Sequence, residues 1–141
     1  MTNNNNNYII RVPKYISLNQ IYWKRIYYPK LRRNWCQGSK LVFLTKSETS
    51  DEVLLGLGKI ERIVELSDLE VAEKKICTDN NYYSKIIFGT MARFIPPLPV
   101  KDSGRESFSF SKISGPSLDG INISDSELTK IEHLANIVVI A

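Results

Sequence analysis

The chain has 141 residues, of which 43% are hydrophobic and 24% are charged, and its formal net charge at pH 7 is +4. This length suits one compact domain with a buried core, and the composition excludes disordered and fibrous proteins. No apolar run approaches the roughly 18 residues of a membrane span. The first residues also lack the basic flank and apolar stretch of a secretory signal. We therefore expect a single domain in the cytoplasm.

The positive charge is concentrated in the first third of the chain. Residues 1–50 contain nine Lys or Arg against one acidic residue, whereas the remaining residues contain ten bases and fourteen acids. Eight of the fourteen aromatic residues also lie among the first fifty. A field polarised in this way steers an anionic partner to one face, and cations interleaved with aromatics offer phosphate pairing and base stacking together. The distribution favours nucleic acid as the partner.

The first elements alternate strand and helix. Residues 1–7 form a polar leader with nothing to bury, and one domain is expected over 8–141. The β-branched and aromatic run at 8–12 predicts a strand. A helix is expected over 17–26, where Ser17 and Gln20 have the spacing of a capping box. The segment 27–37 has no clear period and reads as a loop.

The middle of the chain predicts a hairpin and a further strand. Residues 41–45 and 53–66 are strand-like and are separated by a polar turn, and Gly56 and Gly58 indicate a bend or a close backbone approach. Residues 67–76 have a helical composition. The strand expected over 85–95 should stop at the prolines that follow, because proline supplies no backbone donor.

The C-terminal third begins with an irregular Ser- and Gly-rich connection at 101–120, with one short strand at 108–113. A helix follows Ser124, because Ser124 and Glu127 repeat the capping-box spacing and Leu128 and Ile131 form an apolar stripe. The tail, 136–141, fits either an extension of that helix or a final strand. The order predicts an α+β fold, a small, mixed and strongly bent β-barrel with flanking helices.

Cysteine and histidine usage gives no sign of a metal site. Cys36 and Cys77 lie far apart and are expected to be free thiols, which is the usual state in a cytoplasmic protein. The single histidine, His133, has no second ligand near it in the sequence. No phosphate-binding glycine loop or nucleophile with a base is found at diagnostic spacing. We expect neither a metal nor a cofactor.

The order of motifs resembles the EVE-type members of the PUA-like superfamily, which also includes the ASCH, PUA and YTH domains. The resemblance rests on YIIRV, WCQGSKLVFL, VLLGLGKI, KIIFGTMARFIPPLPV and the capped C-terminal helix, which together cover most of residues 8–136. It implies a small mixed barrel with a concave pocket, which in relatives receives RNA or a modified base extruded from DNA. The acid that the family usually has after its glycine is replaced by Ser39 and Lys40, and the tryptophan cage of YTH domains has no match.

The main candidate site is a basic aromatic loop ahead of the strand at 41–45. Its cations would pair with phosphates, and its exposed aromatics would stack on unpaired bases; the residues are Tyr28, Lys30, Arg32, Arg33 and Trp35. The alternative is a solvated run of charge whose aromatics fill the core, and for Trp35 both interpretations stay open.

A second group of candidates lies at the end of the same strand. The resemblance places Thr45, Lys46 and Ser47 at the border of the pocket, where a hydroxyl would meet the edge of a base. An ordinary turn explains the same residues, because Ser and Thr favour turns.

Two other functions fit the sequence. Some ASCH relatives are small amidohydrolases that use a lysine, a threonine and a glutamate, and Lys40, Thr45 and Glu61 are residues of those types. Such an enzyme would act on a modified nucleoside. A protein-interaction module with a basic face is the third possibility. We expect a nucleic-acid-binding domain, for RNA or a modified base, and no membrane partner.

Overall fold

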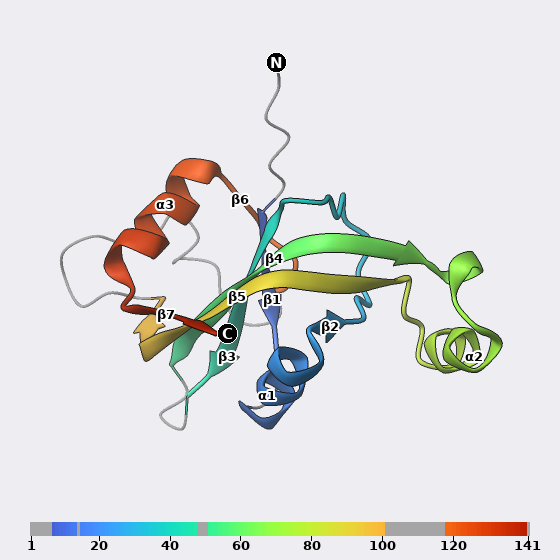
Figure 1. The fold of residues 1–141 in the computed structure, drawn as a ribbon. Helices are drawn as coiled ribbons and strands as arrows, with labels where there is room; N and C mark the ends of the chain where they lie inside the picture. Colours follow the sequence, from blue (N-terminus) through green and yellow to red (C-terminus); the bar gives the residue numbers. More distant parts are fainter. Residues whose placement is uncertain (1–6, 14, 48–50, 101–117, 141) are drawn as a thin grey trace, which may run out of the picture.

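The computed structural model describes residues 7–13, 15–47, 51–100 and 118–140 (Figure 1). The elements follow one another in chain order as β1 (Asn7–Arg11), α1 (Tyr15–Lys24), β2 (Ile26–Tyr27), β3 (Lys40–Lys46), β4 (Glu52–Glu65), the 3-10 turn η1 (Leu66–Asp68), α2 (Val71–Asp79), β5 (Ser84–Pro99), β6 (Asn122–Ile123), α3 (Asp125–Leu134) and β7 (Ile137–Ile140). None of the helices in the described ranges is long and apolar enough to cross a membrane.

The strands form one mixed sheet. Its order is β2-β5-β4-β3-β1-β6, with β7 also paired to β5. The pair β1 and β3 is parallel, and the remaining pairs are antiparallel. The predicted α+β fold with a mixed sheet and flanking helices is therefore confirmed. Within the described ranges the pairing runs as an open path, so the barrel closure that was expected is not seen.

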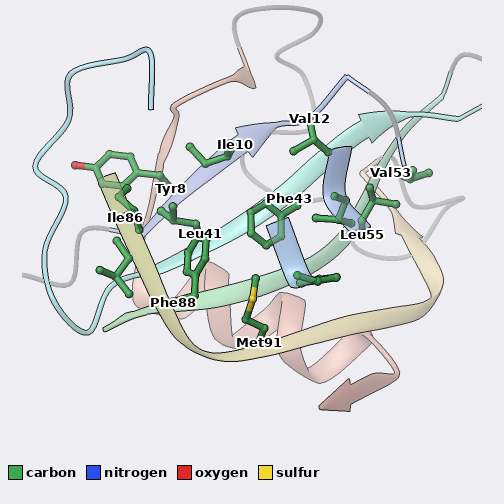
Figure 2. Close-up of a cluster of buried hydrophobic side chains, with 13 residues drawn as sticks. Tyr8, Ile10, Val12, Leu41, Phe43, Val53, Leu55, Ile86, Phe88 and Met91 are labelled. Atoms are coloured by element: carbon green, nitrogen blue, oxygen red, sulfur yellow. The ribbon is translucent and has the colours of Figure 1, made fainter. Parts of the chain in front are cut away.

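The core has two halves, one on each face of the sheet. The apolar run of β3 alternates between them: Leu41 and Phe43 join the cluster beside α1, while Val42 and Leu44 join the cluster beneath α3. Figure 2 shows the first cluster, in which Phe43 lies at the centre between side chains of β1, β4 and β5. A strand that is covered on both faces needs a continuous apolar sequence, which explains this run.

The longest hairpin of the sheet carries α2. Strands β4 and β5 run together away from α1 and α3, and α2 lies at their far end (Figure 1). At the other end of the hairpin, Gly56 allows α1 to approach closely, because a Cβ there would lie 2.1 Å from the Tyr22 hydroxyl. That hydroxyl donates a hydrogen bond to the Ala92 carbonyl at 2.5 Å. The close approach predicted for this glycine is confirmed.

Several boundaries differ from the expectation. Helix α1 begins two residues before Ser17 and ends at Lys24, because Arg25 has a positive φ of 60° and the next two residues pair with β5. The prediction that this strand stops at its prolines was wrong, because β5 continues to Pro99. Pro99 pairs with Val53 across the hairpin, since the carbonyls of prolines and their neighbours still accept hydrogen bonds.

The C-terminal elements settle two further expectations. The Ser124 hydroxyl accepts a hydrogen bond from the backbone N–H of Glu127 at 3.1 Å, which confirms the predicted N-cap of α3. The tail is a strand, β7, and it pairs with the middle of β5. The strand expected at 108–113 lies outside the described residues. Cys36 and Cys77 do not form a disulfide.

Candidate nucleic-acid interface

The basic loop that follows β2 runs alongside the end of the connection between α2 and β5. The Tyr83 N–H donates to the Pro29 carbonyl at 3.0 Å, which joins the two segments. Further along the loop, Arg33 Nε donates to the Gly120 carbonyl at 2.7 Å. These two contacts hold the loop against the segments that lead into β5 and β6, so its charged side chains project from a fixed frame.

Cations and tyrosines are paired along this junction. Tyr28 stacks on Tyr82 with ring centroids 5.2 Å apart and an angle of 16° between the planes. Lys30 Nζ lies 5.7 Å from the centre of the Tyr82 ring. The Arg32 guanidinium lies 4.4 Å from the centre of the Tyr83 ring. We call these five residues the cation–tyrosine strip.

A hollow of about 260 Å³ opens on one side of the strip, between α1 and the segment after β2. We call it the Tyr82 hollow. Its lining includes three tyrosines and two cations. The lining residues are Arg11, Val12, Pro13, Gln20, Ile21, Lys24, Ile26, Tyr27, Tyr28 and Tyr82. Of the cations, Arg11 forms an ion pair with Glu52 at 2.5 Å, and Lys24 is exposed. An aromatic wall with a cationic rim suits a planar ring that carries a phosphate.

The tyrosine wall is fixed by charge contacts with α2. The Tyr28 hydroxyl donates to Glu73 Oε2 at 2.5 Å, and Lys85 Nζ lies 2.9 Å from the same oxygen. The Tyr28 hydrogen bond, followed by the Lys85 contact, lowers the pKa of Glu73 below its usual value. Burial and the same hydrogen bond raise the pKa of Tyr28 above its usual value.

A second hollow, of about 370 Å³, is lined by the strip residues Arg32 and Tyr83. We call it the Trp35 hollow. Polar groups dominate its lining, which consists of Arg32, Arg33, Asn34, Trp35, Ile63, Glu65, Tyr83 and Ser84. Two consecutive tyrosines join the two hollows along the chain, because Tyr82 lines the first and Tyr83 lines the second.

The sequence left open whether Trp35 stacks on a base or packs in the core, and the structure shows features of both. Its ring packs against the core cluster beside α1 and meets the Tyr8 ring edge-on, with centroids 4.9 Å apart. The ring is thus half-buried and engaged with the core. Its indole nitrogen, however, is buried without a hydrogen-bond partner among the described residues. Trp35 therefore lines the hollow with its ring engaged in the core and with its N–H covered.

The other predicted residues lie elsewhere. Thr45, Lys46 and Ser47 are at the opposite end of β3 from the basic loop, with Thr45 only 2% exposed and Lys46 exposed. The Ser47 N–H donates to the Asp51 carbonyl at 2.8 Å, as in a turn. The structure brings Tyr28, Lys30 and Arg32 together in the strip, with Arg33 and Trp35 beside it, and does not bring the end of β3 to them.

The residues of the hydrolase alternative do not meet. Lys40 is paired with Glu132 at 2.8 Å, and Thr45 is buried five residues further along β3. That separation is about 17 Å at the rise of an extended strand. Glu61 is exposed on β4 beside Gly89. A nucleophile and base must lie within hydrogen-bond reach, so these three residues do not form a catalytic centre.

Sequence reasoning missed the tyrosines that complete the strip. Tyr82 and Tyr83 come from the segment between the residues of helical composition at 67–76 and the strand expected over 85–95, more than forty residues after the basic loop. Two adjacent tyrosines in an otherwise polar stretch, with no strand or helix period to bury them, were the available signal. Arg11 and Lys24 of the Tyr82 hollow were counted only as part of the charge.

No family model matches the chain, and no curated protein matches it. Among solved structures, the ASCH protein from Zymomonas mobilis matches with a TM-score of 0.56 and 7% identity, over 94% of this chain and 98% of that one. A point mutant of that protein gives a TM-score of 0.58 with 9% identity, over 96% of this chain and 100% of that one.

A YTH domain has a similar fold. The domain of the Zygosaccharomyces rouxii MRB1 protein, solved in complex with N6-methyladenosine RNA, matches with a TM-score of 0.50 and 13% identity, over 94% of this chain and 87% of that one. Identities this low carry information on architecture alone. Since the mixed sheet and its helices align over nearly the whole chain, this protein has the α+β PUA-like fold of the ASCH and YTH domains.

Proposed function

We propose that this protein binds single-stranded nucleic acid, RNA in the first instance, along the cation–tyrosine strip. The observation that carries the proposal is the pairing of Lys30 and Arg32 with the rings of Tyr82 and Tyr83. No ion pair engages either cation within the described part of the chain. Each cation therefore keeps its donors for phosphate, and the tyrosines beside them supply rings on which bases stack.

The Tyr82 hollow is the proposed place for one base. Its tyrosines offer stacking faces, and the exposed Lys24 offers positive charge. A preference for a modified base belongs to this proposal. The similar YTH domain was solved with N6-methyladenosine RNA, but the present hollow has tyrosines and no tryptophan, so recognition of that base is not carried over.

We also propose that, within the PUA-like fold, the chain is of the EVE type. The support is the order of its motifs along the sheet: the segment with Trp35 leads into β3, and the glycine-containing strand motif forms the first half of β4. An enzyme has less support, because Lys40, Thr45 and Glu61 lie apart.

The proposal is tested by fluorescence anisotropy with labelled single-stranded RNA, single-stranded DNA and duplexes that carry modified bases. Three phosphate contacts on a single strand give a slope of log K against log salt of about −2, since each contributes about −0.7. We expect binding at low salt with a slope at least this steep. Absence of binding to every one of these ligands at low salt would contradict the proposal and leave an acidic protein as the partner to seek.

A further inference from the structure

Trp35 and Ser84 line the Trp35 hollow, and each has a covered polar side-chain atom that the described part of the fold does not use. Trp35 Nε1 and Ser84 Oγ are buried without a hydrogen-bond partner in the described part of the chain. Ser84 is 4% exposed, so its hydroxyl is fully removed from bulk solvent. A buried polar group without a partner destabilises the fold, and its persistence calls for an explanation.

Two charged groups of opposite sign line the same hollow. Glu65 lies opposite Ser84 in the pairing of β4 and β5, and its carboxylate forms no hydrogen bond or ion pair with a described residue. The Arg32 guanidinium contacts the Tyr83 ring and forms no ion pair with another described residue. A carboxylate and a guanidinium that line one hollow without pairing both keep their hydrogen-bonding capacity for a ligand.

We propose that the Trp35 hollow is a second nucleotide-binding subsite that receives the neighbouring nucleotide of the strand bound at the Tyr82 hollow, with guanine as the preferred base. The proposal rests on the proposed function, because it assigns a ligand to the surface beside the same strip. The tyrosines at 82 and 83 are consecutive and line one hollow each, so a single strand passing over them reaches both.

Guanine is the base whose edge matches the unpaired groups. An indole N–H is a donor only, so it requires an acceptor such as a ring carbonyl oxygen. A carboxylate is an acceptor only, and guanine presents two adjacent N–H donors beside its carbonyl oxygen. Glu65 would accept these two donors, while Trp35 and Ser84 would donate to the oxygen. A bare phosphate fits less well, because Glu65 repels it.

The phosphate of this nucleotide would lie at the rim. Arg33 uses Nε for the Gly120 carbonyl at 2.7 Å and one further nitrogen for the Arg32 carbonyl at 2.8 Å, which fixes its position and leaves other N–H groups unused. Since the indole nitrogen and the Ser84 hydroxyl are covered, the base must displace a neighbouring side chain to reach them. The exposed Arg32 and Tyr83 are the candidates for this movement.

The test compares four labelled pentanucleotides of RNA that differ only at the central base, which is guanine, adenine, cytosine or uracil within uridines. We expect the unaltered protein to bind the guanine pentamer at least about fivefold more tightly than the other three, the lower end of the discrimination given by a bidentate base contact. Trp35→Phe removes the N–H and keeps an aromatic ring against Tyr8. Glu65→Gln removes the carboxylate at an exposed position. Each variant should reduce the preference to less than about twofold.

The matched control is Glu61→Gln, which changes the same group at another exposed position of β4 outside both hollows. It should retain the full preference, and thermal unfolding of each variant verifies the fold. Equal binding of all four pentamers by the unaltered protein would overturn the subsite and leave the proposed function standing. A guanine preference that survives both Trp35→Phe and Glu65→Gln would also overturn it. Absence of any binding would overturn both proposals.

Discussion

The two ends of β3 were expected to contribute to one site, and they differ in what surrounds them. At the start of β3, the basic loop meets tyrosines from the connection between α2 and β5, and the Lys30 and Arg32 cations lie over aromatic rings. At the other end, Thr45 is buried and Ser47 is part of a turn. The comparison teaches that a cation becomes part of a binding surface through its neighbours, because an isolated exposed lysine offers charge without a stacking face.

Charge reversal in the basic loop should have the largest effect on the affinity for RNA. Arg32→Glu combined with Arg33→Glu replaces two potential phosphate contacts with repulsion, and we expect affinity for single-stranded RNA at low salt to fall by about a hundredfold or more. The control is Lys59→Glu combined with Arg62→Glu, which changes the charge equally at two exposed positions of β4 outside both hollows. Anisotropy titrations measure both. Equal losses in the two double variants would mean that the total charge, and not the loop, governs binding.

Removal of one tyrosine should have the next largest effect. Tyr82→Ala deletes the ring that stacks on Tyr28 and lies beneath Lys30, and base stacking on an aromatic side chain contributes about 1–3 kcal/mol. Affinity should therefore fall by roughly five- to 150-fold. Tyr82→Phe keeps the ring and should bind as the unaltered protein does. An affinity of the alanine variant equal to that of the phenylalanine variant would remove stacking from the proposal.

One lysine of the basic loop, Lys30, and one at the far end of β3, Lys46, provide the most direct comparison. Lys30→Glu should make the slope of log K against log salt shallower by about 0.7, the contribution of one phosphate on a single strand. Lys46→Glu should leave the slope unchanged, because Lys46 lies at the far end of β3. A shallower slope for Lys46→Glu would show that the bound strand extends along β3 and would break the comparison.

The smallest effect concerns the stability of the protein at acidic pH, through Glu73 of α2. Tyr28 and Lys85 lower the pKa of Glu73 in the folded state from its usual value of 4.5. The folded state thus holds the ionised carboxylate more favourably than the unfolded chain does. This stabilisation is complete above pH 4.5 and is lost as the pH falls through the lower, folded pKa.

Chemical denaturation at a series of pH values measures this contribution. Glu73→Gln should show a shallower fall in the free energy of unfolding below pH 4.5 than the unaltered protein shows. Glu70→Gln, at an exposed position before α2, is the matched control and should keep the steeper fall. Parallel curves for the unaltered protein and the Glu73 variant would contradict the link between the Tyr28 hydrogen bond and stability.

Much of the fold follows from local patterns. The β-branched run of β1, the double-sided apolar run of β3 and the N-cap of α3 all have a local physical cause, and each was predicted at or near its observed position. The continuation of β5 through its prolines was not, since the long-range pairing of Leu98 and Pro99 with β4 decides it. Predictions failed where a distant partner outweighed the local preference.

The candidate site, like the fold, could be predicted from the sequence only in part. The sequence by itself determined that a loop rich in cations and aromatics precedes β3, because charge and residue type need no partner to be read. Only the tertiary structure decided which cations matter together. It placed Tyr82 and Tyr83 beneath Lys30 and Arg32. The physical reason is that stacking and hydrogen bonding act over a few ångströms, and the chain brings residues within that range only by folding.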